Sequence, residues 1–404
     1  MRRNARLLRW LAGSLGIGLL ALAAAACSPQ AAVDRDRTSS RAARVHRDAF
    51  VFDGHCDTAL DMLREEIDLG RRRDDGHIDI PRMRAGGLDA QVFALWPEPD
   101  HWPDHAARRT LQLADAVLRA IERHPDELAL ARSAADARRI QRSGRIAVFL
   151  GIEGGHAIED ELALLRMFHR LGVRLMTLTW MRNTHWADAS GDEAEHGGLT
   201  PFGERVVREM NRLGMVIDVS HVADSTFYHV LRISRRPVVA SHSGARAVCP
   251  HHRNLDDAML RALAENGGVV GINYFTGFLD PRAAPVFEAM WDELEPLWQA
   301  HRDQPERYRE LRKPIVARYE ARLPRVTIAR LLDHIDHVVQ VAGIDHVALG
   351  SDFDGISYTP AGLDDVSDLP HVTAGLLERG YSADEVRRIL GGNLMRVFAA
   401  AIGR

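Results

Sequence analysis

Residues 50–58, FVFDGHCDT, form a short apolar run that ends in a His-x-Asp motif. In a β-strand alternate side chains share a face, so His55 and Asp57 point the same way and Cys56 points to the opposite face. An imidazole beside a carboxylate is a ligand pair that Zn²⁺ accepts. A lone motif of this kind is more often a buried histidine next to a turn-capping aspartate, so the rest of the chain has to decide.

Short β-branched runs alternate with amphipathic helical stretches from residue 50 onward. This alternation predicts βα units around a parallel sheet, and eight units predict an α/β fold of the (β/α)8 TIM barrel type. Side chains that end the strands of such a barrel meet at one edge. The predicted strands are residues 50–55, 90–96, 146–153, 174–180, 216–221, 238–242, 269–274 and 347–352.

Most of these predicted strands end in side chains that bind metals or move protons. Three histidines and two acids exceed what one tetrahedral site needs, so we expect two metal ions, with Glu153 shared between them. The ligands of one ion would be His55, Asp57 and Glu153, and those of the other would be Glu153, His221 and His242.

Two Zn²⁺ ions are the favoured occupants because zinc accepts mixed imidazole and carboxylate ligands, although Mn²⁺ and Fe²⁺ also suit this set. Such a pair activates a shared water and polarises the substrate oxygen. Asp352 is left over from the ligand count. It is therefore the predicted proton shuttle, which takes a proton from the water and gives it to the leaving amine.

The composition fits a large folded chain with an ample core, because 46% of the 404 residues are hydrophobic and 27% are charged. The formal net charge is -4 and no long basic patch occurs, so nucleic acid is not an expected partner. There are three cysteines. Two of them, Cys56 and Cys249, are predicted to be buried thiols.

The N-terminus has the pattern of an export signal. Four arginines precede an apolar run that ends in small residues before Cys27. We expect residues 1–26 to be a signal peptide and residues 27–41 to be a lipidated Cys27 with a flexible tether, so that a lipid anchor holds the protein on a membrane at the cell envelope. An ordinary cleaved signal peptide is the alternative. The barrel domain would then occupy residues 42–404.

Two later segments stand out from the repeating units. Residues 278–325 form an insertion before the last predicted strand, and we expect a helical lid, a contact in a homodimer, or a plain surface decoration. Residues 382–398 begin with a capping box, Ser382 to Glu385, and continue with apolar residues at helical spacing. This second segment predicts a helix that faces the core.

Several ordered motifs make the chain from about residue 50 to 398 similar to the membrane (renal) dipeptidase family of the amidohydrolase superfamily, as a bacterial lipoprotein-like member. The resemblance implies a binuclear zinc barrel that hydrolyses dipeptides and tolerates a D-residue at the C-terminal position. It implies the same five metal ligands, and it places Arg253 where the family holds the free carboxylate of the dipeptide. The matching motifs are DGHCD at 53–57, DIPR at 79–82, EGGH at 153–156, LTPFG at 199–203, DVSH at 218–221, SHS at 241–243, HRN at 252–254 and DFDG at 352–355.

One position departs from the family pattern. Many members carry a histidine after the fourth strand that contacts the substrate carbonyl, whereas this chain has Trp180. An indole donates one hydrogen bond but carries no titratable proton. His185 and Arg182 are the nearby side chains that could replace the histidine.

Two alternative hypotheses remain open beside the dipeptidase. The same residues could hydrolyse an N-acyl amino acid, a lactone or a β-lactam, or the chain could be a non-catalytic binding lipoprotein.

Three other histidines are not predicted to bind metal. We expect His334 and His337 to lie on a solvated helix face and His156 to support the Glu153 carboxylate.

Overall fold

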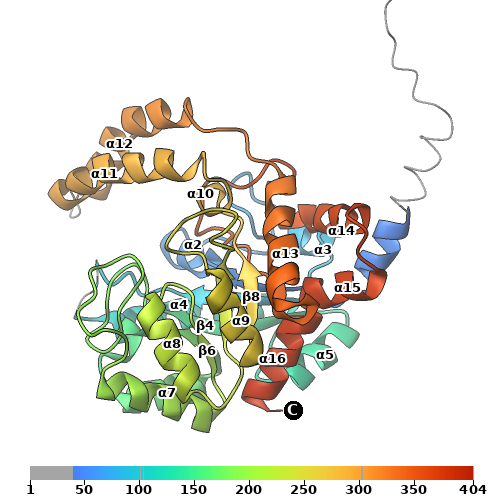
Figure 1. The fold of residues 1–404 in the computed structure, drawn as a ribbon, viewed down its shortest axis with the longest axis horizontal. Helices are drawn as coiled ribbons and strands as arrows, with labels where there is room; N and C mark the ends of the chain where they lie inside the picture. Colours follow the sequence, from blue (N-terminus) through green and yellow to red (C-terminus); the bar gives the residue numbers. More distant parts are fainter. Residues whose placement is uncertain (1–39, 101, 103, 302–303, 404) are drawn as a thin grey trace, which may run out of the picture.

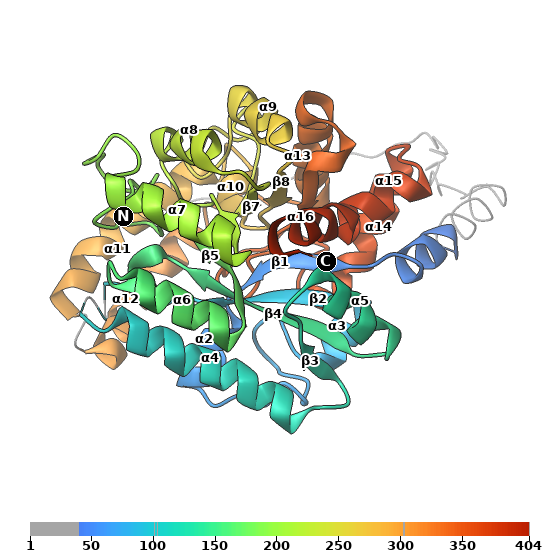
Figure 2. The same ribbon diagram turned by 90° about the horizontal axis from the view of Figure 1, so that it is seen from below.

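The computed structural model describes residues 40–100, 102, 104–301 and 304–403, and these form a closed parallel barrel with helices around it (Figures 1 and 2). Around the barrel the order of the strands is β1–β2–β4–β5–β6–β7–β8–β9, and β9 pairs with β1. The predicted (β/α)8 TIM barrel is confirmed. The eight barrel strands are β1 Phe52–Cys56, β2 Ala90–Leu95, β4 Ile146–Glu153, β5 Val173–Thr177, β6 Val216–Asp218, β7 Val239–Ser243, β8 Val269–Ile272 and β9 Val347–Leu349.

A further short strand, β3 (Leu128–Leu130), pairs in parallel with the first residues of β4 and was not predicted. Its three residues are too few to show a period. The barrel strands themselves are apolar and buried at nearly every position, as in β4 with its sequence IAVFLGIE. Helices cover the outer face while side chains fill the interior, so neither face of a strand meets water.

The helices form a ring around the strands (Figure 2). Their amphipathic spacing buries one face against the barrel, as in α4, where Leu113, Ala114 and Val117 are buried. The helices are α2 Thr58–Arg64, α3 Ile80–Ala85, α4 Ala106–Arg123, α5 Ala134–Arg142, α6 Leu162–Leu171, α7 Pro201–Leu213, α8 Asp224–Ile233, α9 Asp257–Glu265, α10 Thr276–Leu279, α11 Ala284–His301, α12 Pro305–Glu320, α13 Ile328–Ala342, α14 Leu369–Glu378, α15 Ala383–Arg387 and α16 Asn393–Ile402.

The C-terminal helix begins as predicted, with the capping box between Ser382 and Glu385 present on both sides. It is not continuous, however, because a π-helical turn over Arg388–Gly392 separates α15 from α16. A Cβ on Gly391 would lie 2.2 Å from the Phe50 carbonyl oxygen, so only glycine allows the chain to approach the start of β1 this closely. Beyond this turn, α16 packs Phe398 against Phe52 and closes one end of the barrel.

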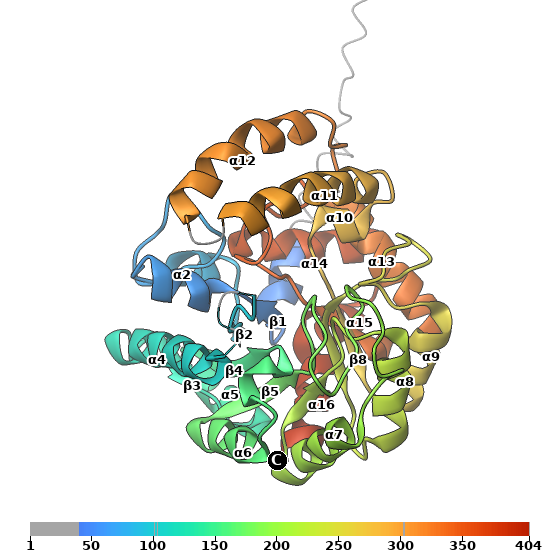
Figure 3. The same cartoon turned by 90° about the vertical axis from the view of Figure 1, so that its left-hand side faces the viewer.

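The insertion at 278–325 contains the helical hairpin α11–α12, which lies on the side of the barrel opposite α16 (Figures 1 and 3). It has a small apolar core of its own, including Phe287, Met290 and Tyr319. This core also includes Phe275 and Phe278, at the start of α10 and within it. Within the described part of the chain, every helix is too short or too polar to cross a membrane.

The structure tests some of the remaining predictions. Cys56 and Cys249 are buried free thiols, as expected. The solvated helix face predicted for His334 is wrong, because its ring is fully buried and hydrogen-bonds to the backbone of Ala245 and Leu279. The predicted signal peptide, Cys27 and the tether as far as residue 39 lie outside the described residues, and residues 40 and 41 are helical.

Candidate active site

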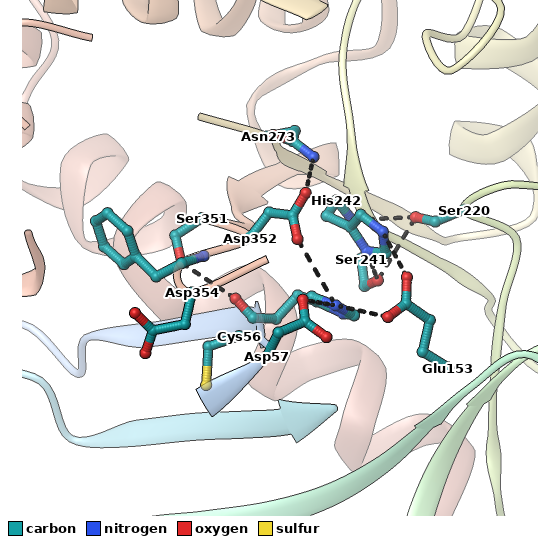
Figure 4. A network of polar contacts seen from close by, with 12 residues as sticks. Cys56, Asp57, Glu153, Ser220, Ser241, His242, Asn273, Ser351, Asp352 and Asp354 are labelled. Atoms are coloured by element: carbon teal, nitrogen blue, oxygen red, sulfur yellow. Dashed lines mark hydrogen bonds and ion pairs between the residues drawn. The ribbon is translucent and has the colours of Figure 1, made fainter. Parts of the chain in front are cut away.

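Six acidic and histidine side chains from five strands or the residues just after them meet at the carboxyl edge of the barrel. Figure 4 shows Asp57, Glu153, His242 and Asp352 pointing toward one another. The two oxygens of Glu153 face different partners. Glu153 Oε1 lies 3.0 Å from His221 Nε2 and 3.4 Å from His242 Nε2. Glu153 Oε2 lies 3.4 Å from His55 Nε2, which in turn lies 3.3 Å from Asp57 Oδ2.

The backbone aims these groups at the site. His55 is the penultimate residue of β1. Asp57 occupies the N-cap position of α2, yet its carboxylate makes no capping hydrogen bond. The reading of Asp57 as a turn-capping residue is therefore wrong. His221 and Asp352 adopt positive φ angles of 67° and 62°. This conformation is costly for residues other than glycine, and residues held in it cluster at functional sites.

A chain of hydrogen bonds fixes His242 from behind. The Ser241 hydroxyl lies 2.7 Å from His242 Nδ1 and donates to Asp218 Oδ2 at 2.6 Å. Thr177 Oγ1 donates to the same oxygen, and the backbone amide of Ser220 donates to the other. Because the serine proton is committed to Asp218, His242 Nδ1 must carry the proton that Ser241 accepts. The His242 Nε2 lone pair then points at Glu153 and His221.

Asp352 also lies close to His55, with its Oδ1 3.9 Å from His55 Nε2. Asn273 Nδ2 donates to the other carboxylate oxygen at 2.8 Å. Burial raises the pKa of Asp352, the Glu153 charge adds to this increase, and His55, Asn273 and Arg253 oppose it. The carboxyl therefore stands beside the ligand cluster in a position suited to holding and passing a proton.

Arg253 is buried, with 2% of its surface exposed, so the alternative of a surface salt bridge is wrong. Its guanidinium donates to the His242 carbonyl at 3.0 Å and lies over the Phe278 ring. Burial lowers the pKa of Arg253 to about 10. Among the described residues its Nε has no hydrogen-bond partner and no carboxylate forms an ion pair with it. A buried cation in this state is suited to bind an anionic group of a ligand.

The donor set fits divalent cations. His221 Nε2 and His242 Nε2 lie 2.9 Å apart, and the His242 proton is on Nδ1, so at most one of the two facing atoms carries a proton. His55 Nε2 is buried without a hydrogen-bond partner in the described part of the chain. Two buried carboxylates, Asp57 and Glu153, and the half-buried Asp352 share this site with one guanidinium. Such a cluster of lone pairs and negative charge is stabilised by bound metal ions.

Comparisons with known proteins agree with this geometry. Residues 39–402 match the family described as membrane dipeptidase (peptidase family M19). This chain belongs to the membrane dipeptidase family. It is therefore a metallo-dipeptidase, a peptide hydrolase whose chemistry requires metal.

Several relatives cover most of the chain. The dipeptidase aclJ of Aspergillus oryzae is 37% identical over 331 residues, which are 80% of this chain and 69% of that protein. The structure of the probable dipeptidase PvdM from Pseudomonas aeruginosa is 27% identical with a TM-score of 0.80, covering 91% of this chain and 99% of that one. A metallopeptidase from Rhodobacter sphaeroides, liganded with a phosphinate mimic of the dipeptide L-Ala-D-Ala, is 29% identical with a TM-score of 0.72 and covers 88% of this chain and 100% of that one.

Trp180 stands where the resemblance implied a histidine, and each of the two substitutes proposed for that histidine is already paired with another residue. The His185 side chain is 90% exposed and pairs with Asp160. Arg182 pairs with Asp100 and with Glu295 of α11.

His156 was expected to support Glu153. Its Nε2 instead hydrogen-bonds to the Asn183 carbonyl oxygen, and its Nδ1 has no hydrogen-bond partner among the described residues. His156 therefore makes no hydrogen bond to the Glu153 carboxylate in the described part of the chain.

Sequence reasoning assigned no role to Asp218, Ser241 or Asn273. The motifs DVSH and SHS placed Asp218 and Ser241 next to proposed ligands, and that adjacency was the available signal. Asn273 directly follows β8, and the sequence contains no signal for its role beyond this place at the carboxyl edge.

Proposed function

We propose that this membrane dipeptidase holds two Zn²⁺ ions and hydrolyses the amide bond of small dipeptides with a free carboxylate. The division of the two Glu153 oxygens between His55 on one side and His221 and His242 on the other carries this proposal. A carboxylate in this position suits a ligand shared by two ions. His55 and Asp57 would complete one set of ligands, and His221 and His242 the other.

Bound zinc ions would polarise the scissile carbonyl and lower the pKa of a water molecule. The residues of the chain perform the other tasks. Asp352 accepts the proton of the attacking water and passes it to the leaving amine, because its carboxyl stands next to the ligand cluster and is kept in place by Asn273. Ser241 and Asp218 keep His242 in the tautomer that presents Nε2 to the site.

Arg253 would bind the carboxylate of the second residue through two parallel hydrogen bonds. Its lack of a carboxylate partner among the described residues supports this role. A grip on the carboxylate alone leaves the configuration at the neighbouring Cα unspecified, so we also propose tolerance of a D-residue at the C-terminal position. The Rhodobacter sphaeroides relative binds a mimic of L-Ala-D-Ala, which supports the same proposal.

The test is a hydrolysis panel with purified, zinc-loaded protein. We expect cleavage of dipeptides with L or D residues in the second position and about two zinc ions per chain by elemental analysis. Cleavage of N-acyl amino acids, lactones or β-lactams without dipeptides would overturn the substrate class. Two bound ions with no hydrolysis of any substrate would instead support the binding lipoprotein.

We further propose that the protein is exported and attached to a membrane of the cell envelope through lipid on Cys27. The arginine-rich start and the apolar run before Cys27 support this location. Detergent phase partitioning of the expressed protein tests it. The wild type should enter the detergent phase, and Cys27→Ala should remain in the aqueous phase. Equal partitioning of both would contradict the anchor.

A further inference from the structure

Two indoles meet at the carboxyl edge of the barrel, and the proposed chemistry uses neither of them. Trp96 directly follows β2, and Trp180 lies three residues after the end of β5. Their ring centroids lie 4.8 Å apart with the planes tilted by 46°. Both side chains are half-buried. The Trp96 Nε1 is buried and has no hydrogen-bond partner in the described part of the chain. This pair is a large apolar surface at the edge where substrate must arrive.

The strand register places the pair on either side of Glu153. In β2 and β4, Leu95 pairs with Ile152, so the next residue of each strand is Trp96 and Glu153. On the other side, Glu153 pairs with Thr177 of β5, shortly before Trp180. Since β4 lies between β2 and β5, the two rings meet across its end.

The chain that follows Glu153 passes beside Trp180. Gly154 adopts a φ angle of 100°, which residues with a side chain rarely adopt. A Cβ built on Gly154 would lie 3.6 Å from the Trp180 Cβ, an ordinary contact distance. Together with the strand register, this contact places the two rings next to the end of β4, where Glu153 lies between the metal-ligand groups.

Arg253 lies on the other side of the barrel. In the closed strand order, β8 is opposite β4, and β7 is opposite β2. Arg253 follows β7, and its guanidinium packs over Phe278, which follows β8. A dipeptide held by its carboxylate at Arg253, with its amide at the ligand cluster, would extend its N-terminal residue toward Trp96 and Trp180.

We propose that Trp96 and Trp180 form the wall that contacts the side chain of the substrate's N-terminal residue and selects apolar and aromatic residues there. This inference rests on the proposed dipeptidase function. Indole faces gain contact area with apolar and aromatic groups. Arg182, two residues after Trp180, is already paired with Asp100 and Glu295, so it is not free to pair with an acidic side chain of the substrate.

The experiment compares Phe-Gly, Gly-Phe and Gly-Gly as substrates of the zinc-loaded protein. We expect wild type to prefer Phe-Gly over Gly-Gly by about tenfold or more in kcat/KM, as an apolar contact of this size provides. Trp96→Ala and Trp180→Ala should bring that ratio close to one and should change the ratio of Gly-Phe to Gly-Gly by less than about threefold. Trp180→Phe should retain most of the preference.

Tyr228→Ala on α8 is the matched control, because Tyr228 is an exposed aromatic residue, 43% accessible, outside the site. If both alanine variants keep the wild-type ratio of kcat/KM for Phe-Gly to that for Gly-Gly, the proposed role of Trp96 and Trp180 is wrong. It is also wrong if kcat/KM falls equally for all three substrates.

If the wild type cleaves none of these dipeptides, the proposed function fails. Calorimetric binding of the same three compounds then tests whether Trp96 and Trp180 contact the N-terminal side chain. Binding of Phe-Gly that is tighter than that of Gly-Phe and depends on Trp180 supports the wall, and its absence overturns it.

Discussion

Ser241 donates its hydroxyl proton to Asp218 across 2.6 Å, and this bond joins neighbouring strands β6 and β7 behind the candidate metal site. The same hydroxyl oxygen accepts the Nδ1 proton of His242. A carboxylate that fixes a ligating histidine through a second group sets the tautomer and the ring orientation together. Ser241 is therefore a positioning residue for His242.

Ser241→Ala should weaken binding of the ion near His242 by about 10- to 100-fold, which is the usual effect of losing such a partner. The variant frees the His242 Nδ1 and allows the proton to move to Nε2, where it blocks the ligand atom. Zinc content after titration with a competing chelator measures the effect. Ser243→Ala on the same strand is the control, because its hydroxyl contacts Ser220 and not His242. Equal zinc affinity in Ser241→Ala and Ser243→Ala would contradict the positioning role.

Asp352→Asn should keep both metals and lose turnover by about 10²- to 10⁴-fold, because an amide cannot accept and pass on a proton. Zinc analysis and kcat on a dipeptide measure the two parts separately. A second variant tests the hydrogen bond that Asn273 donates to Asp352. Asn273→Ala should lower kcat less than Asp352→Asn does, since it removes this hydrogen bond but keeps the Asp352 carboxyl group. Near-normal turnover in Asp352→Asn would remove Asp352 from the mechanism.

Much of this site could be predicted from the sequence because two simple rules suffice. The period of two in a strand puts His55 and Asp57 on one face, and the parallel barrel brings the strand ends together at one edge. Those rules locate Glu153, His221 and His242 without any knowledge of contacts. The fold followed from the alternation of apolar runs and amphipathic stretches.

Other features depend on how separate segments are placed relative to each other. The bond between Ser241 and Asp218 depends on the register of β6 and β7, and that between Asn273 and Asp352 depends on the residues after β8 and β9. The break at Gly391 arises from a close approach to Phe50, more than 300 residues earlier in the chain. Local patterns contain no information about such contacts, so helical spacing alone predicted one continuous helix there.

Arg253→Lys should raise KM for dipeptides by roughly 10- to 100-fold, because a lysine cannot make the two parallel bonds and charge-assisted hydrogen bonds contribute about 1.5–3 kcal/mol. A dipeptide with an amidated C-terminus lacks the carboxylate, so its kinetic constants should change little between wild type and variant. Steady-state kinetics on the matched acid and amide measure this difference. Equal effects on both substrates would show that Arg253 does not read the carboxylate.

His334 provides a prediction on stability that is independent of the active site. Its ring is fully buried, Nδ1 accepts from the Ala245 amide, and Nε2 donates to the Leu279 carbonyl. Burial lowers the pKa of His334 to about 4. In the unfolded chain the pKa is about 6.5, so the unfolded state binds a proton first as the pH falls. The stability from neutral His334 is complete above pH 6.5 and is lost as the pH falls from 6.5 to about 4.

His334→Gln should remove this part of the pH dependence, because a glutamine amide can accept from Ala245 and donate to Leu279 without titrating. The free energy of unfolding of the wild type minus that of the variant should fall by about 3 kcal/mol between pH 7 and pH 4, so the variant gains in relative stability at low pH. Urea unfolding at several pH values measures it, and the comparison cancels the contribution of other buried histidines such as His251. Parallel curves for the two proteins across this range would show that His334 does not destabilise the fold in acid.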